Sequence, residues 1–196
     1  KHSPSAWKMS NARLSWSWEG CEGQQAIVEV YARAAYVRLY KNQVLIGKKR
    51  MPSSCRVLFR TTYEPGELKV VAYDGKHQVI GTHTLVSAGK ETMLQLLPEK
   101  RNVQKGEVIF IPMKYTDEKG TVKPTKRGNI HVSATGAEIL GIGNGCPYHS
   151  QSYVGQETET YYGEALVVVR ANGEGDIHIQ GTDGILSAQT VLNCRI

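Results

Sequence analysis

Apolar and polar residues alternate along most of this chain, and that alternation is typical of β-strands with one face buried. In the first half, the strands it predicts are residues 26–32, 36–41, 56–63, 67–74, 78–86 and 92–99. Turn-forming residues separate them at Asn42-Gln43, at Glu64–Glu67 and at Asp74–His77. The Asp74-Gly75 pair predicts a tight hairpin, because glycine accepts a positive φ without steric cost.

A polar, charged connector at residues 99–107 has no apolar periodicity, and the alternating pattern restarts after it. The strands predicted there are residues 108–117, 129–136, 137–145, 164–171, 176–182 and 186–194, with a long polar stretch at 146–160. No segment has a helical period. Short strands in two runs predict an all-β protein of two tandem β-sandwiches, in domains 1–98 and 99–196.

The charge of the chain is uneven between these halves. Residues 1–98 hold 14 Lys and Arg against 7 Asp and Glu, whereas residues 99–196 hold 10 against 11. The positive residues are scattered and no RNA-binding or zinc-finger signature accompanies them, so we expect no nucleic-acid partner. A solvated face, or docking on an acidic neighbouring domain, accounts for the excess.

The sequence says little about the location of the protein. No apolar run approaches the ~18 residues of a membrane span, and the N-terminus lacks a signal-peptide pattern, so we expect no membrane partner. The chain begins at Lys1 and not at Met, which suggests a piece of a larger protein. Cytoplasm and secretion both remain open for that protein.

Motifs that carry chemistry are missing from the sequence. There is no nucleophile elbow, phosphate-binding loop or His-Glu-x-x-His, and we predict neither catalytic residues nor a cofactor. The four cysteines are too sparse for a disulfide scaffold, and Cys146 with His149 supplies too few ligands for a zinc site, so we predict a loop there. The glycines at 141–145 lack a following helix and are interpreted as a bend or bulge in a strand.

Aromatic side chains are the remaining candidates for binding. In an extended segment, Trp16 and Trp18 of WSWEG point the same way, and they either anchor a core or offer flat surfaces to a sugar. We expect this segment to open the first strand, with at least one ring in the core or at a seam with another domain. The candidate carbohydrate contacts are Trp16, Trp18, Tyr148 and Tyr153, with Trp7, Tyr161 and Tyr162 as further candidates.

Several motifs together identify a family. The stretches are WSWEGCEG, VEVYARAAYVRLYKNQVLIGKKR, TYEPGELKVVAYDGKHQVIGTHTLVSAG and GNIHVSATGAEILGIGNGCPYHSQSYVGQETETYYGEALVVVRANGEGDIHIQGTDGIL. They resemble the C-terminal β-sandwich domains of glycoside hydrolase family 2, chiefly β-galactosidases. The resemblance covers nearly all of residues 7–190. It implies immunoglobulin-like sandwiches that follow a catalytic (β/α)₈ barrel, whose two glutamates perform retaining hydrolysis and have no counterpart here.

The resemblance also implies a role. The two sandwiches would support or shape the barrel, or form a subunit interface in a homo-oligomer, and in some relatives such a domain reaches the mouth of the active site. An aromatic loop with Tyr148 and Tyr153 could then contact substrate. Two other functions stay open: a carbohydrate-binding module that uses exposed aromatics, and an adhesion or spacer tail.

One departure from the family pattern concerns a hairpin. The family usually has Asn-Gly where this chain has Asn42-Gln43. A type I′ turn needs positive φ at both central residues, so Gln43 should either cost up to about 1 kcal/mol or force another turn type.

Overall fold

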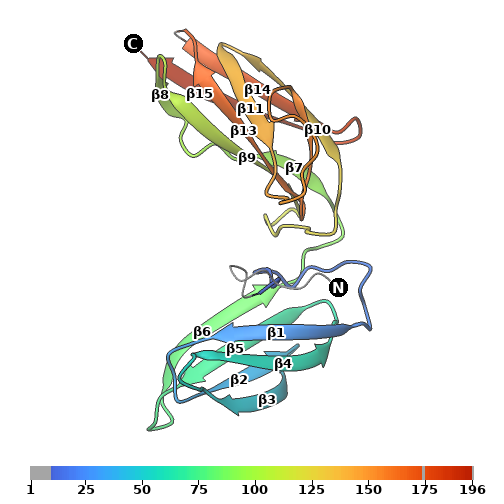
Figure 1. Ribbon diagram of the computed structural model, residues 1–196, viewed down its shortest axis with the longest axis vertical. Coiled ribbons are helices and arrows are strands. Elements are labelled where there is room, and N and C mark those ends of the chain that lie inside the picture. The colour runs from blue at the N-terminus through green and yellow to red at the C-terminus, as the bar shows by residue number, and fades with distance from the viewer. Residues whose placement is uncertain (1–9, 174, 196) are drawn as a thin grey trace. The chain divides into compact units, whose positions relative to one another are not determined.

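The computed structural model describes residues 10–173 and 175–195, and its regular elements are fifteen β-strands (Figure 1). The prediction of an all-β protein is confirmed. The described residues contain no helix long and apolar enough to cross a membrane. The chain divides into two compact units, residues 1–87 and 88–196, which are described separately below.

The first unit packs a two-stranded sheet on a four-stranded sheet. The small sheet pairs β1 (Gln25–Tyr31) with β4 (Arg56–Thr62), and the larger one has the order β3-β2-β5-β6. Its strands are β2 (Tyr36–Lys41), β3 (Val44–Arg50), β5 (Glu67–Tyr73) and β6 (Val79–Val86), and all pairs are antiparallel. Alternate residues of both sheets form the core, such as Val37, Leu39 and Phe59.

The β2–β3 hairpin has a tight two-residue turn although its second central residue is Gln43 and not glycine. Asn42 has φ 46° and Gln43 has φ 68°, so the turn is type I′ with glutamine in a left-handed conformation. The Asn42 side chain reaches the next turn, where its Oδ1 accepts a hydrogen bond from the Glu67 amide at 2.8 Å. A Cβ on Gly66 would lie 2.0 Å from that oxygen, so only glycine fits beside Asn42.

The β5–β6 hairpin exists, but the predicted role of its glycine was wrong. The positive φ belongs to His77 (66°) and not to Gly75. Asp74 explains the difference, because its Oδ1 accepts hydrogen bonds from the amides of Lys76 and Gln78 at 2.9 and 2.8 Å. These bonds organise a longer loop than the two-residue turn that the Asp-Gly pair favours.

The second unit packs a five-stranded sheet on a four-stranded sheet. The first has the order β12-β10-β14-β15-β8 and the second β11-β13-β9-β7. Their bounds are β7 Met93–Leu96, β8 Asn102–Gln104, β9 Val108–Thr116, β10 Asn129–Thr135, β11 Ala137–Gly143, β12 Glu157–Glu159, β13 Glu164–Ala171, β14 Gly175–Thr182 and β15 Ser187–Arg195. Only β15 and β8 pair in parallel among these strands. Fully buried side chains such as Ile111, Ile130 and Leu192 fill the space between the sheets.

Two strand assignments from the sequence are corrected. The connector at 99–107 contains β8, whose Val103 is buried opposite Cys194 of β15. The strand predicted to close the first sandwich, β7, instead pairs with β9 of the second unit. The compact units divide after Ser87, whereas the sequence places the boundary after residue 98. The organisation into domains 1–98 and 99–196 stays a prediction.

The glycine-rich strand β11 has the predicted bulge. Its register against β13 shifts between Ile139 and Gly141. A Cβ on Gly143 would lie 2.5 Å from the ring of Tyr153. The glycines therefore allow the next loop to approach the strand closely.

Candidate functional site

Trp16 is a core residue of the first unit. It is 3% exposed, packs edge-on against Tyr63 with ring centroids 5.0 Å apart, and donates from Nε1 to the Glu64 carbonyl at 3.0 Å. The Ser87 hydroxyl donates to its backbone carbonyl. The prediction of one ring in the core is confirmed. The prediction that WSWEG opens the first strand was wrong, because β1 begins at Gln25.

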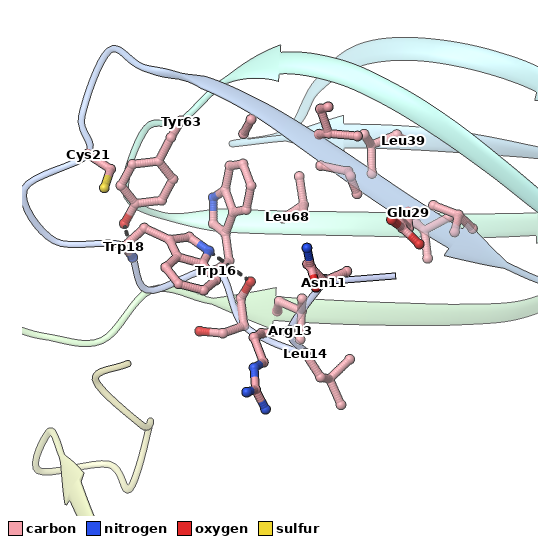
Figure 2. Close-up of a pocket in the computed structure, with 18 of the residues that line it drawn as sticks. Asn11, Arg13, Leu14, Trp16, Trp18, Cys21, Glu29, Leu39, Tyr63 and Leu68 are labelled. Atoms are coloured by element: carbon pink, nitrogen blue, oxygen red, sulfur yellow. Dashed lines mark hydrogen bonds between the residues drawn. The ribbon is translucent and has the colours of Figure 1, made fainter. Parts of the chain in front are cut away.

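Trp18 is half-buried next to Trp16. Its amide donates to the Tyr63 hydroxyl at 3.0 Å, and its Nε1 donates to the Ser15 carbonyl at 3.3 Å. Both tryptophans line a cavity of about 740 Å³ (Figure 2). Figure 2 shows the rings of Trp16, Trp18 and Tyr63 grouped at one end of this cavity and Glu29 toward the other end.

The cavity exists because the two sheets of the first unit differ in width. Only two strands face a sheet of four, so the inner sides of β5 and β6 lack a strand opposite them. Leu68, Val70 and Leu85 line the cavity from those strands, and β1 lines it along its unpaired edge. Residues 11–16 run along the opening (Figure 2). The site is mostly apolar, and Trp16, which lines it, is almost completely buried.

The outer side of the β1–β4 sheet carries apolar and charged side chains in alternation. Val28 and Val30 point into the core, so Ile27, Tyr31 and the cross-strand residue Leu58 share the outer side. They are 54%, 59% and 41% exposed. We call these three side chains the apolar face.

A polar network lies among these side chains, because Glu29 is on the same side of β1 as Ile27 and Tyr31 and directly opposite Leu58. The Tyr31 hydroxyl donates to Glu29 Oε2 at 2.6 Å, and Arg56 pairs with Glu29 Oε1 at 3.2 Å. The hydrogen bond from Tyr31, followed by those from Ser10 and Arg56, holds the pKa of Glu29 below its ordinary value despite partial desolvation. Glu29 is therefore a charged, structural carboxylate at neutral pH.

The outer face of the four-stranded sheet carries tyrosines and cations. Tyr36 stacks on Tyr73 with centroids 4.7 Å apart and planes inclined by 5°. Lys48 Nζ lies 4.0 Å from the centroid of Tyr36, and Arg38 Cζ lies 5.1 Å from that of Tyr73. We call the outer side of this sheet the tyrosine–cation face; its tyrosines and cations are Tyr36, Arg38, Tyr40, Lys48, Arg50, Lys69 and Tyr73, and Glu67 and Val71 lie on the same side. The sequence analysis missed it, although the alternation Tyr-x-Arg-x-Tyr at 36–40 signals one shared face.

The candidate tyrosines of the second unit lie in the loop between β11 and β12. Tyr148 is 76% exposed and Tyr153 is 55% exposed. The ring of Tyr153 packs on Gly143 and lies 4.8 Å from the ring of His149. Its carbonyl accepts a hydrogen bond from the Ile142 amide at 2.9 Å.

Asn144 fixes the shape of that loop. Its Nδ2 donates to the Glu159 carbonyl at 2.7 Å and lies 3.2 Å from His149 Nδ1, while its Oδ1 accepts from the Cys146 amide at 2.8 Å. These hydrogen bonds hold the base of the loop in place, and Tyr148 of the same loop is exposed to solvent. Cys146 and His149 lie in this loop, as predicted.

The four candidate residues form two groups. Trp16 and Trp18 lie together in the first unit, and Tyr148 and Tyr153 lie together in the second. Tyr161 and Tyr162 are half-buried and pack edge to face, with centroids 4.5 Å apart. Trp7 lies outside the described residues. That any of them contacts carbohydrate stays a prediction.

Comparison with known proteins identifies the family of this chain. Residues 94–191 match the family model for glycoside hydrolase family 2 C-terminal domain 5, and residues 23–80 match a domain of unknown function (DUF4982). The chain belongs to glycoside hydrolase family 2. It is 27% identical over 164 residues to beta-galactosidase BoGH2A of Bacteroides ovatus, which covers 81% of this chain and 19% of that protein.

Solved structures agree with this family 2 assignment. A family 2 member from Bacteroides cellulosilyticus DSM 14838 is 27% identical, covers 97% of this chain and 27% of its own, and has a TM-score of 0.88. A beta-glycosidase from Bacteroides vulgatus shares the fold at 22% identity, with a TM-score of 0.78 over 91% of this chain and 24% of its own. The chain thus spans about a fifth to a quarter of the length of these relatives.

In this family 2 chain, Tyr115 and Asp183 have shifted pKa values, and each is a structural partner of the other. Burial is the main cause that raises the pKa of Tyr115, and the carboxylate of Asp183, 2.6 Å from its hydroxyl, adds to the effect. Burial pushes the pKa of Asp183 upward, but hydrogen bonds from Tyr115 and from the amides of Leu186 and Ile185 lower it overall. Within residues 10–173 and 175–195, no three His, Cys, Asp or Glu side chains gather in a way that could hold a metal ion.

Proposed function

We propose that this chain is a non-catalytic, C-terminal part of a family 2 glycosidase of β-galactosidase type, and that it supports the catalytic (β/α)₈ barrel. The parent enzyme would hydrolyse O-glycosidic bonds with glutamates of the barrel. The burial of Trp16 carries this proposal, because a ring that is 3% exposed anchors a core and cannot stack on a sugar.

The apolar face indicates where the support acts. Ile27, Tyr31 and Leu58 cluster on one outer side of the first sandwich and are all substantially exposed. Exposed apolar clusters on soluble domains mark interaction sites. The partner we propose is the catalytic part of the same polypeptide, since the relatives are about three and a half to four and a half times as long as this chain. A subunit interface at this face is the alternative partner.

The test is made in the intact glycosidase. The double variant Ile27→Glu/Leu58→Glu should lower the Tm by about 4 °C or more, because it places two charges in a buried apolar contact. Ile80→Glu/Val86→Glu is the matched control, since it adds the same charges at exposed apolar positions of β6. An unchanged Tm in the first variant, or an equal loss in both, would refute docking through the apolar face.

The main competing function is a carbohydrate-binding module. It is tested by titrating the chain with neutral galactosides and plant glycans while following tryptophan fluorescence. The proposal predicts a flat response, because Trp16 and Trp18 are held by Tyr63, Glu64 and Ser15. Saturable quenching or a blue shift at sub-millimolar sugar would replace the proposed function with the module.

A second candidate role concerns Tyr148 and Tyr153. Their exposure, and the tether through Asn144, favour contact with substrate at the active-site mouth of the intact enzyme. Tyr148→Ala/Tyr153→Ala should then lower kcat/KM by about tenfold, whereas Val154→Ala in the same loop should not. An unchanged kcat/KM in the tyrosine variant would remove this role.

A further inference from the structure

The two outer faces of the first sandwich differ in chemistry. The apolar face lies on β1 and β4, whereas the outer face of β3-β2-β5-β6 carries four cations, Arg38, Lys48, Arg50 and Lys69, against one acid, Glu67. The register places these residues on one side, because the intervening Val37, Leu39 and Leu68 point into the core. An electropositive surface of this kind attracts a negatively charged partner.

The tyrosine rings on this face are not available for stacking. Tyr36 has Tyr73 on one side and the Lys48 ammonium on the other, and Arg38 lies over Tyr73. Proteins that bind neutral sugars or single-stranded nucleic acid through aromatic residues need an open ring face. This face therefore offers charge and hydrogen bonds, and the tyrosines hold the cations in place.

Arg38 is the cation with the most fixed position. It is half-buried, lies over the Tyr73 ring and forms a hydrogen bond to Tyr40. Its cross-strand neighbour on β3 is Lys48, whose side chain is exposed. A planar guanidinium held in one orientation matches the two oxygens of a carboxylate, and Lys48 adds a second positive charge next to it.

A protein partner fits this face less well than a carbohydrate chain. The centres of protein interfaces are depleted in lysine, whereas Lys48 and Lys69 both lie on this face. We propose that the tyrosine–cation face binds an acidic polysaccharide whose sugars carry carboxylate groups. The choice of a polysaccharide rests on the proposed function as part of a glycosidase. The charge complementarity between this face and a carboxylate does not depend on that proposed function.

The test measures binding of the chain to polygalacturonate, with dextran as the neutral probe. Arg38→Gln/Lys48→Gln should weaken polygalacturonate binding about tenfold, because each exposed ion pair contributes only a few-fold in affinity. Lys105→Gln/Lys119→Gln is the matched control, which removes the same charge from exposed positions of the second unit and should change affinity less than about twofold. Added salt should weaken binding of the unmodified chain.

A second variant guards against damage to the fold. Arg50→Glu reverses a charge on the same face and leaves Tyr36, Tyr73 and Lys48 in place, so the tyrosine stack should persist while binding weakens. Equal losses in the control, binding of dextran, or no binding of polygalacturonate would each overturn the proposal. Heparin binding without polygalacturonate binding would overturn the carboxylate assignment, and displacement by duplex DNA at equal charge concentration would assign the face to nucleic acid. The docking proposal is tested by variants of β1 and β4, and the polysaccharide proposal by variants of β2 and β3. Either proposal can therefore fail while the other holds.

Discussion

Gln43 shows how a single residue can carry strain without changing the fold. It occupies a left-handed conformation, with φ 68°, in a type I′ turn, where glycine is favoured at this position. We predict that Gln43→Gly raises the free energy of unfolding by about 0.5–1 kcal/mol, because glycine takes this conformation without a Cβ clash. Urea denaturation measures it. Gln43→Ala is the control and should bring no such gain, and a destabilised glycine variant would contradict the account.

Tyr115 links the core of the second unit to a turn. Its side chain is fully buried, its hydroxyl donates to Asp183, and a Cβ on Gly128 would lie 2.0 Å from that hydroxyl. We expect Tyr115→Phe to lower the free energy of unfolding by about 2 kcal/mol, since it removes a hydrogen bond to a charged acceptor and leaves the ring in place. Phe110→Leu, on an exposed position of β9, should have a much smaller effect. A loss below about 0.5 kcal/mol for Tyr115→Phe would show that the bond is not structural.

The same pair predicts how stability depends on pH. The pKa of Asp183 is lowered in the folded chain, so its stabilising contribution is present above the ordinary aspartate pKa and is lost as the pH falls below about 4. The pKa of Tyr115 is raised, so its contribution is lost only as the pH rises above about 10. In Tyr115→Phe, thermal denaturation should depend less on pH at both ends. Identical pH profiles for the two proteins would contradict this.

Among the elements, β6 has the most exposed edge. It pairs only with β5, its eight residues include no Lys, Arg, Asp or Glu, and seven of them are exposed. Long uncharged edge strands promote association between chains. We therefore expect Thr84→Lys to reduce light scattering by concentrated solutions of this chain, whereas Gln189→Lys, on the interior strand β15, should not. Equal scattering in all three proteins would mean that β6 does not mediate association.

The sequence predicted elements where they are long and regularly alternating, as in β9 and β13. It missed β3, because the run Val-Leu-Ile followed by Gly-Lys-Lys-Arg does not alternate, and it missed β8 and β12, which have three residues each. The strand β8 exists only through pairing with β15 some 90 residues later. It placed β7 in the wrong sandwich for the same reason, since alternation identifies a strand but not its partner. The burial of Trp16 was predictable from residue type. The stack of Tyr36 and Tyr73 needed the register of β2 on β5.

At the scale of the whole molecule, the first sandwich presents two faces of different chemistry. Ile27, Tyr31 and Leu58 suit a dry contact with the catalytic part of a glycosidase, and the tyrosine–cation face suits a charged ligand in solvent. This division explains why an excess of positive charge and exposed apolar side chains occur in the same half of the chain. It also requires that, in a longer enzyme, the apolar face is covered while the tyrosine–cation face stays in solvent.

Hydrogen exchange tests this requirement most directly, by comparison of the 196-residue chain with the same residues inside the intact glycosidase. The account predicts slower exchange of amides in β1 and β4 in the intact enzyme, because docking covers the apolar face and the unpaired edge of β1. Amides of β2 and β3 should exchange at the same rate in both proteins, because their outer face stays in solvent. Unchanged exchange in β1 and β4 would contradict the docking role, and protection confined to β2 and β3 would place the catalytic partner on the tyrosine–cation face.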